Sequence, residues 1–260
     1  MVVLEAMKMQ HVLIAPSALR TVRNLVVPGQ VVGTGEPLVV FTRTDAGGDG
    51  SSSTSALDLD RSRADLDEVR ERHRLTLDEG RQGAVAKRHN RGRRTARENI
   101  ADLADAGSFV EYGALAIAAQ RSRRSEEDLI ANTPADGLVA GLATIGADRF
   151  GPTAAEAVVV SYDYTVLAGT QGMRNHAKTD RVFDLAARKR VPVVLFAEGG
   201  GGRPGDTDVG GMAGLDVPTF RMLAGLSGRV PLVAIVSGRC FAGNAALAGV
   251  CDVLIATPDT

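Results

Sequence analysis

From residue 137 onward, apolar β-branched runs alternate with helical stretches, and this alternation limits the possible folds more than any other feature. The strand-like runs are 157–167, 191–198, 230–238 and 252–258. The helical stretches between them are 174–190, 217–228 and 238–251, the last opening from a loop. Nearly continuous apolar strands separated by helices are typical of a sheet that is covered on both faces. The pattern therefore predicts an α/β region.

The whole chain divides into three parts by composition. Residues 1–43 contain short β-like segments separated by Pro and Gly, and residues 44–57 form a Gly/Ser-rich linker with almost nothing to bury. From residue 58 the third part begins, and it runs to residue 260. Its start predicts an amphipathic helix over 63–77 and a second helix that begins at Thr95 with a capping box and ends at Gly107.

Charge and cysteine content exclude several classes of function. The 30 basic residues balance 31 acidic ones, so a general attraction to nucleic acid is not expected. No apolar run approaches the roughly 20 residues of a membrane helix, and the first residues lack the features of a signal peptide. Two cysteines, Cys240 and Cys251, cannot form a four-cysteine zinc site, and we expect no metal. A cytoplasmic location is expected.

The most unusual short motif is Glu5-Ala6-Met7-Lys8-Met9, which joins two apolar β-like segments. A tight turn normally uses Asn, Asp or Gly, whereas this one presents a lysine between two methionines. The motif resembles the biotin-attachment hairpin of biotin carboxyl carrier domains, and the segments 14–16 and 27–33 resemble the strands that follow it. The resemblance implies that Lys8 is amidated by biotin through a biotin protein ligase. The plain alternative is a solvated lysine at a fraying terminus.

Only seven residues precede Lys8, whereas the family places a comparable half-module before the lysine. Strands over 2–6 and 9–14 would leave unpaired edges and an uncovered apolar face. We therefore expect that Met1 is not the beginning of a folded module and that the chain is a fragment of a larger protein.

Two glycine-containing loops follow predicted strands. Residues 198–203 read Glu-Gly-Gly-Gly-Gly-Arg, and residues 238–244 read Gly-Arg-Cys-Phe-Ala-Gly-Asn. Such loops can direct backbone N–H groups at one carbonyl oxygen and so form an oxyanion hole. The alternatives are a flexible loop for the first, and small residues that allow close helix–strand packing for the second. For the second loop the residues alone favour neither interpretation.

A basic group begins the predicted helix near residue 173: Arg174, His176, Lys178 and Arg181. A helix N-terminus attracts anions, so cations at the same place indicate a phosphate-rich ligand. An ordinary solvated helix face is the alternative.

Residues from about 60 to 260 resemble the N-terminal part of a biotin-dependent acyl-CoA carboxyltransferase domain, which has the ClpP/crotonase superfold. The matching stretches are 95–113, 136–146, 169–206 and 230–257. Together with the biotinyl/lipoyl-type hairpin module, this order is similar to the end of single-chain, multidomain acyl-CoA carboxylases. The resemblance implies an α/β crotonase-like carboxyltransferase region, incomplete at its end, preceded by a partial all-β carrier domain.

The resemblance also implies roles for individual residues. Gly200 and Gly201 would donate the N–H pair that stabilises the enolate of the acyl thioester. Lys178 and Arg181 would lie near the CoA phosphates. The acyl-CoA pocket would be shaped by Ala242, Gly243 and Asn244. Carboxybiotin would supply the carboxyl group for the α-carbon, and the ureido nitrogen of biotin would remove the α-proton.

The expected partners are an acyl-CoA, a biotin carboxylase domain or subunit that uses ATP and bicarbonate, and further copies of the chain. The chain alone is expected to be inactive. One alternative is a biotin-dependent decarboxylase subunit with a membrane partner. A second is a non-catalytic carrier and CoA-binding piece. An enoyl-CoA hydratase would need acid/base glutamates beside the loops, where only Glu198 stands. The identity of the acyl chain does not follow from these residues.

Overall fold

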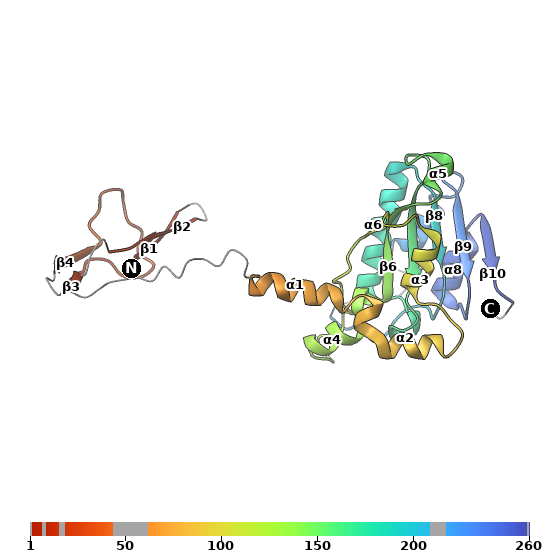
Figure 1. Cartoon of the computed structure of the whole chain (residues 1–260), viewed down its shortest axis with the longest axis horizontal. Helices are drawn as coiled ribbons and strands as arrows, with labels where there is room; N and C mark the ends of the chain where they lie inside the picture. Colours follow the sequence, from red (N-terminus) through yellow and green to blue (C-terminus); the bar gives the residue numbers. More distant parts are fainter. Residues whose placement is uncertain (1, 7–8, 16–18, 44–61, 209–216, 259) are drawn as a thin grey trace. The chain divides into compact units, whose positions relative to one another are not determined.

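The computed structural model describes residues 2–6, 9–15, 19–43, 62–208, 217–258 and 260. The chain divides into two compact units, Met1–Ser62 and Arg63–Thr260 (Figure 1). The predicted linker 44–57 lies outside the described residues. Each unit is therefore considered by itself.

The first unit contains two antiparallel strand pairs. Strands β1 (Val2–Ala6) and β2 (Met9–Leu13) pair from Val2–Leu13 to Ala6–Met9, and β3 (Leu19–Asn24) pairs with β4 (Val39–Arg43). Between β3 and β4, Gly29 and Gly35 adopt positive φ angles of 86° and 84°, as tight turns require. Val3, Val12 and Phe41 are about half exposed, so these pairs bury little apolar surface. The expectation of short strands in this region is confirmed.

The second unit is built on a six-stranded sheet with the order β10-β9-β8-β7-β6-β5. The strands are β5 (Val110–Glu111), β6 (Leu138–Thr144), β7 (Glu156–Tyr162), β8 (Val193–Phe196), β9 (Leu232–Val236) and β10 (Val253–Ala256). Strands β7 to β10 are parallel, and β5, β6 and β7 are antiparallel. Each of the four strands predicted from apolar runs overlaps one of the parallel strands, and β7 begins one residue before its predicted run.

Helices cover both faces of this sheet (Figure 1). The crossovers between parallel strands contain α6 (Met173–Lys189), α7 (Thr219–Ala224) and α8 (Ala242–Val250). They form one core in which Val158 and Val160 of β7 pack with Val182 and Phe183 of α6. The intervening Val159 points to the other face, where it forms a smaller core with α3 (Ala96–Leu103). The predicted α/β architecture is confirmed.

The predicted capping box begins α3 at Thr95. The N–H of Glu98 donates to Thr95 Oγ1 at 3.1 Å, and the N–H of Thr95 donates to Glu98 Oε2 at 2.7 Å. The helix ends at Leu103, before the Gly107 that was predicted to close it. The cap therefore marks where the helix starts, and the helix ends because Ala104 is already extended, with φ −86° and ψ 149°.

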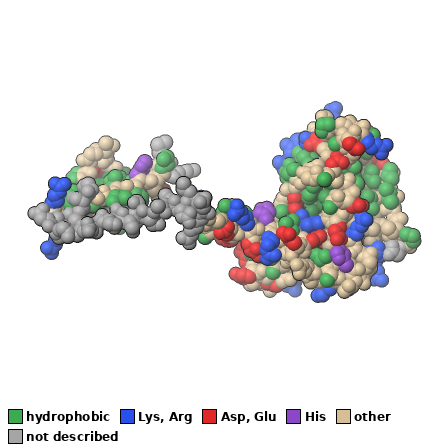
Figure 2. Space-filling view, in the orientation of Figure 1, with side chains coloured by type: hydrophobic (Ala, Val, Ile, Leu, Met, Phe, Trp, Pro, Cys, Tyr) green, Lys and Arg blue, Asp and Glu red, His purple; other side chains and the backbone are tan. Residues whose placement is uncertain are grey.

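The remaining helices are α1 (Ala64–Arg74), α2 (Gln82–His89), α4 (Glu126–Asn132) and α5 (Ala147–Phe150). The helix predicted over 63–77 is α1, which ends three residues earlier and buries no side chain. In the part of the chain that the structure describes, no helix combines the length and apolarity needed to cross a membrane. One face of the second unit carries acidic and basic side chains side by side (Figure 2).

Candidate functional site

The two glycine loops meet at the carboxyl ends of β8 and β9. Gly199 and Cys240 form an isolated parallel bridge beyond the two strands. The N–H of Gly199 donates to the carbonyl of Arg239 at 2.7 Å, and the N–H of Phe241 donates to the carbonyl of Gly199 at 3.0 Å. Gly199 has a φ of 103°, and a β-carbon there would lie 2.5 Å from the Ala168 carbonyl oxygen. Only glycine therefore fits this crossing point.

Gly201 lies against the first turn of α8. A β-carbon on Gly201 would lie 2.5 Å from Ala242 Cβ and 2.9 Å from Gly243 N. Within the described part of the chain, the N–H groups of Gly201, Ala242 and Gly243 make no hydrogen bond. The two loops thus bring free donors from different strand ends together, as a backbone oxyanion hole requires.

Gly200 is less suited to the role that the resemblance implied. Its N–H already donates to the carbonyl of Ala168 at 3.1 Å. The donor pair predicted from sequence, Gly200 with Gly201, is therefore not the pair that this structure leaves available. Gly201 and the start of α8 provide the free donors.

A left-handed turn at residues 167–169 packs against the glycine loops. Leu167, Ala168 and Gly169 have successive φ angles of 47°, 55° and 65°, an uncommon conformation for the first two residues. The turn presents the Ala168 carbonyl to Gly200 and the Gly169 carbonyl to Asn244. Strain of this kind persists only where the surrounding contacts enforce it.

Asn244 is fully buried behind the loops. Its Nδ2 donates to the carbonyls of Gly169 at 3.0 Å and Glu198 at 2.7 Å. Its side chain ties α8 to the left-handed turn and to the start of the first glycine loop. The structure therefore places Asn244 as a brace for the loops, whereas Ala242 is exposed at the surface and Gly243 partly so.

Arg203, at the end of the glycine cluster, holds the loop to the turn before α6. Its Nε and Nη2 donate to Thr170 Oγ1 and Thr170 O at 3.0 and 2.7 Å. Its Nη1 pairs with Asp136 and lies 3.6 Å from Asp206. Arg203 is 4% exposed and both carboxylates are buried, so this network works in a water-poor environment.

The same two carboxylates cap the N-terminus of α6. Asp206 Oδ2 accepts from the N–H of Met173 at 2.8 Å, and Asp136 Oδ2 accepts from the N–H of Asn175 at 2.7 Å. This helix end, which the sequence suggested as a phosphate site, is therefore already filled by the protein's own anions. The sequence alone did not predict this capping, because neither Asp136 nor Asp206 lies near residue 173 in the chain.

The basic residues at the start of α6 separate into two kinds. Lys178 is 8% exposed, and its Nζ donates to the carbonyls of Ala135, at 2.8 Å, and Leu138. His176 is buried beside Thr219, and burial with the nearby Arg203 charge lowers its pKa to about 4. Arg174 and Arg181 are exposed, the latter 3.6 Å from Asp184. The ammonium of Lys178 is bound to main-chain carbonyls in this structure, which does not favour the predicted contact of Lys178 with the CoA phosphates.

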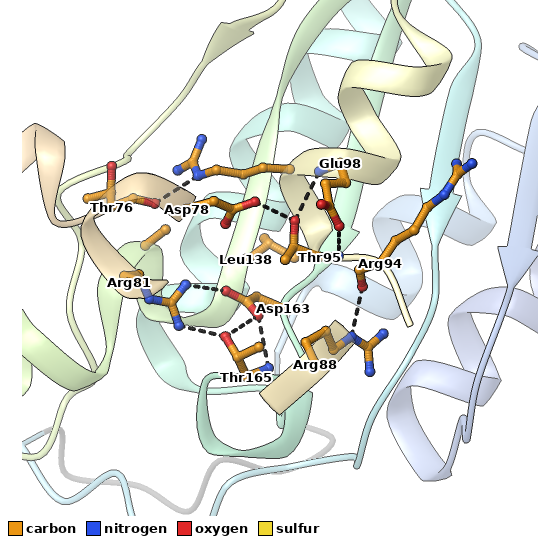
Figure 3. Close-up of polar contacts among 12 residues, drawn as sticks. Thr76, Asp78, Arg81, Arg88, Arg94, Thr95, Glu98, Leu138, Asp163 and Thr165 are labelled. Carbon is orange, nitrogen blue, oxygen red and sulfur yellow. Dashed lines mark hydrogen bonds and ion pairs between the residues drawn. The ribbon is translucent and has the colours of Figure 1, made fainter. Parts of the chain in front are cut away.

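Glu198 is not available as an acid or base. Both of its oxygens accept from the guanidinium of Arg88, and the two side chains are 9% and 7% exposed. Arg88 also lies 5.5 Å from the centre of the Tyr164 ring, and its Nε donates to the carbonyl of Arg94 at 2.7 Å (Figure 3). The carboxylate therefore fixes the segment before the glycine loop to α2.

The chain is similar to proteins of one family. Residues 87–260 match the family model of the carboxyl transferase domain. The chain is 31% identical over 214 residues to the propionyl-CoA carboxylase beta chain of Saccharopolyspora erythraea, covering 81% of this chain and 36% of that protein. It is 34% identical over 197 residues to the biotin-dependent long chain acyl-coenzyme A carboxylase beta4 subunit of Mycobacterium tuberculosis. This match covers 75% of this chain and 34% of that subunit.

Two solved structures are also similar. A single-chain, multi-domain long-chain acyl-CoA carboxylase is 82% identical with a TM-score of 0.73, covering 99% of this chain and 24% of that chain. The transcarboxylase 12S structure, described as a hexamer with bound substrate, is 28% identical with a TM-score of 0.60, covering 75% and 36%. The chain thus spans about a third of the length of the curated relatives that it matches.

Proposed function

Because the chain belongs to the carboxyl transferase domain family, we propose that it is the carboxyltransferase part of a biotin-dependent acyl-CoA carboxylase. The observation that carries this proposal is the contact of Gly201 with the first turn of α8. It gathers free backbone donors from two loops at one edge of the sheet. The similarity over 99% of the chain to a single-chain long-chain acyl-CoA carboxylase supports a long-chain acyl-CoA as the substrate.

The backbone donors would act on the thioester carbonyl. The N–H of Gly201 and an N–H of Ala242 or Gly243 would donate to its oxygen, and these bonds strengthen as negative charge develops on enolate formation. The dipole of α8 favours the same charge. Arg203 and Asn244 would hold the two loops at a fixed separation, so that no reorganisation is needed during reaction. Arg181, exposed on α6, is retained as a candidate contact for the CoA moiety.

Biotin fits the first unit as the cofactor. The pairing of β1 with β2 ends at Ala6 and Met9, which flank residues 7 and 8. Residues 7 and 8 themselves lie outside the described residues. When bound, biotin supplies the carboxyl group for transfer and a site that can accept the α-proton. We propose Lys8 as its point of attachment, with a biotin protein ligase and a biotin carboxylase as partners, and a homo-oligomer as the working assembly.

The test is carboxylation of a long-chain acyl-CoA by the purified protein that carries this chain. We expect incorporation of labelled bicarbonate that needs ATP and is blocked by avidin. Streptavidin should detect the protein, and Lys8→Arg should abolish both signals while the circular dichroism spectrum is unchanged. Incorporation that is insensitive to avidin, or biotin that persists in Lys8→Arg, would contradict the proposal.

The other functions are less well supported. A hydratase would need a free glutamate at the loops, but Glu198 is ion-paired to Arg88. If the chain were a decarboxylase subunit, the protein should release carbon dioxide from a carboxylated thioester in a sodium-dependent reaction. If it were a non-catalytic piece, no assembly that contains it should show turnover. The carboxylation assay separates these cases directly.

A further inference from the structure

Gln171, in the segment between β7 and α6, contacts both loops of the proposed oxyanion hole. It forms an isolated parallel bridge with Gly202. Its N–H donates to the carbonyl of Gly201 at 2.9 Å, and its carbonyl accepts from the N–H of Arg203 at 2.9 Å. The main chain of Gln171 therefore holds the loop after β8 on either side of Gly202.

The side chain of Gln171 reaches the second loop. It is 1% exposed, so it lies inside the protein. A β-carbon on Gly243, in the first turn of α8, would lie 2.2 Å from Gln171 Oε1 and 2.9 Å from Gln171 Cδ. The Cα–H of Gly243 that stands in place of a side chain therefore points at the amide oxygen, which is a recurring type of close contact in proteins. One glutamine thus spans from the backbone of Gly201 to the backbone of Gly243.

Tyr162 fixes the position of this side-chain amide. Gln171 Nε2 donates to Tyr162 Oη at 3.1 Å. Tyr162 is the last residue of β7, is 3% exposed and belongs to the main core. Burial raises the pKa of Tyr162, so its hydroxyl stays neutral and can accept this bond throughout the physiological pH range. The amide is therefore anchored to the sheet by a hydrogen bond in a water-poor environment, where such a bond is strong.

We propose that the side-chain amide of Gln171 is a positioning group for the oxyanion hole, and that it keeps the first turn of α8 in register with the N–H of Gly201. The inference rests on the proposed function and names a residue that sets the geometry of the donors without touching the thioester. Backbone donors stabilise a developing charge only if they are already in place, and a misplacement of about 1 Å can lower the rate roughly a hundredfold. Because the amide acts through Gly243, it should influence kcat more than the binding of the acyl-CoA.

The kinetic test uses two variants of the intact protein. Gln171→Met keeps the length of the side chain and removes the amide, whereas Tyr162→Phe removes only the hydroxyl that anchors it. Steady-state carboxylation should show kcat lowered roughly tenfold in each variant, with little change in KM. The double variant should be no slower than Gln171→Met, because the two groups act as a unit.

Matched controls make the same chemical changes elsewhere. Gln82→Met changes an exposed glutamine at the first position of α2, and Tyr112→Phe changes a partly buried tyrosine. Neither side chain makes a hydrogen bond among the residues that the structure describes. Both controls should keep the wild-type kcat.

Infrared spectroscopy gives a second readout, which a merely structural role would not move. The probe is a long-chain acyl-CoA with an isotope label in its thioester carbonyl. Bound to the wild-type protein, this carbonyl should absorb at a lower frequency than in buffer, because the aligned N–H groups polarise it. In Gln171→Met and Tyr162→Phe the frequency should return toward the value in buffer, while the affinity for the acyl-CoA changes little.

Wild-type kcat and carbonyl frequency in both variants would overturn the inference. Losses in kcat that multiply in the double variant would also overturn it, because they would indicate two independent effects. A lowered unfolding temperature with an unshifted carbonyl frequency would assign the pair to stability alone. Failure of the proposed function would look different, since the wild-type protein itself would then carboxylate no acyl-CoA.

Discussion

A β-carbon on Gly201 would lie 2.9 Å from the backbone nitrogen of Gly243. The distance is shorter than real side chains tolerate, and the atom on the other side belongs to the main chain, which cannot rotate away. The absence of a side chain at position 201 is therefore what allows the N-terminus of α8 to approach the loop after β8.

Gly201→Ala should accordingly separate the two sets of donors. Gly201 does not need a positive φ, so the effect would come from the contact with α8 alone. Loss of one aligned donor lowers kcat by roughly a hundredfold. We expect this change in steady-state carboxylation by the intact protein, with a much smaller change in KM.

The control for this variant is Gly249→Ala in the same helix. A β-carbon there would meet nothing within 4 Å, and alanine is the better helix former by roughly 1 kcal/mol. It should keep full activity and unfold at an equal or higher temperature. Similar activity in the two variants would disprove a close functional contact at Gly201.

Arg203 offers a test of loop positioning. Arg203→Met would leave Asp136 and Asp206 buried without their cation, which typically costs about 3–5 kcal/mol of unfolding free energy. Arg203→Lys would retain the charge and lose the forked contact with Thr170. We therefore expect lysine to restore much of the stability measured by urea unfolding, but little of kcat. Full recovery of kcat by lysine would show that only the charge matters.

The sequence was sufficient for some of these features and insufficient for others. The parallel strands and the Thr95 cap depend on local patterns, namely apolar runs and a four-residue motif, so they could be predicted. The network of Arg203 with Asp136 and Asp206 joins residues up to 70 positions apart, and no local pattern links them. For Lys178 the local pattern was misleading. Its basic neighbours in sequence suggested an exposed cation, whereas in the structure its ammonium is buried against the carbonyls of the turn at 135–138.

Asn244 should be replaceable by neither alanine nor aspartate. Its Nδ2 is the donor for two carbonyls, and aspartate would place a carboxylate oxygen against them. We expect Asn244→Asp to be less stable than Asn244→Ala near pH 7. The deficit should shrink as pH falls, because a protonated carboxyl can donate again. Asn90→Asp, at an exposed asparagine just after α2 whose side chain makes no hydrogen bond among the described residues, is the control and should change the unfolding free energy little. A pH-independent deficit in Asn244→Asp would contradict this assignment.

Lys178→Met tests the buried ammonium through the pH dependence of stability. Burial is the main cause that lowers the pKa of Lys178 to about 8; Arg97 lowers it further, while Glu111 and Asp136 oppose the shift. Between pH 8 and the unfolded value of about 10.4 the unfolded chain binds more protons at this residue, so stability from Lys178 rises with pH. The unfolding free energy of the wild-type protein should therefore rise by on the order of 3 kcal/mol relative to that of Lys178→Met across this pH window, and should not change below it.

Urea unfolding at closely spaced pH values measures the difference, and the same substitution at the exposed Lys87 of α2 is the matched control. A difference that stays constant, or that falls as pH rises, would mean that Lys178 does not carry its charge into the interior.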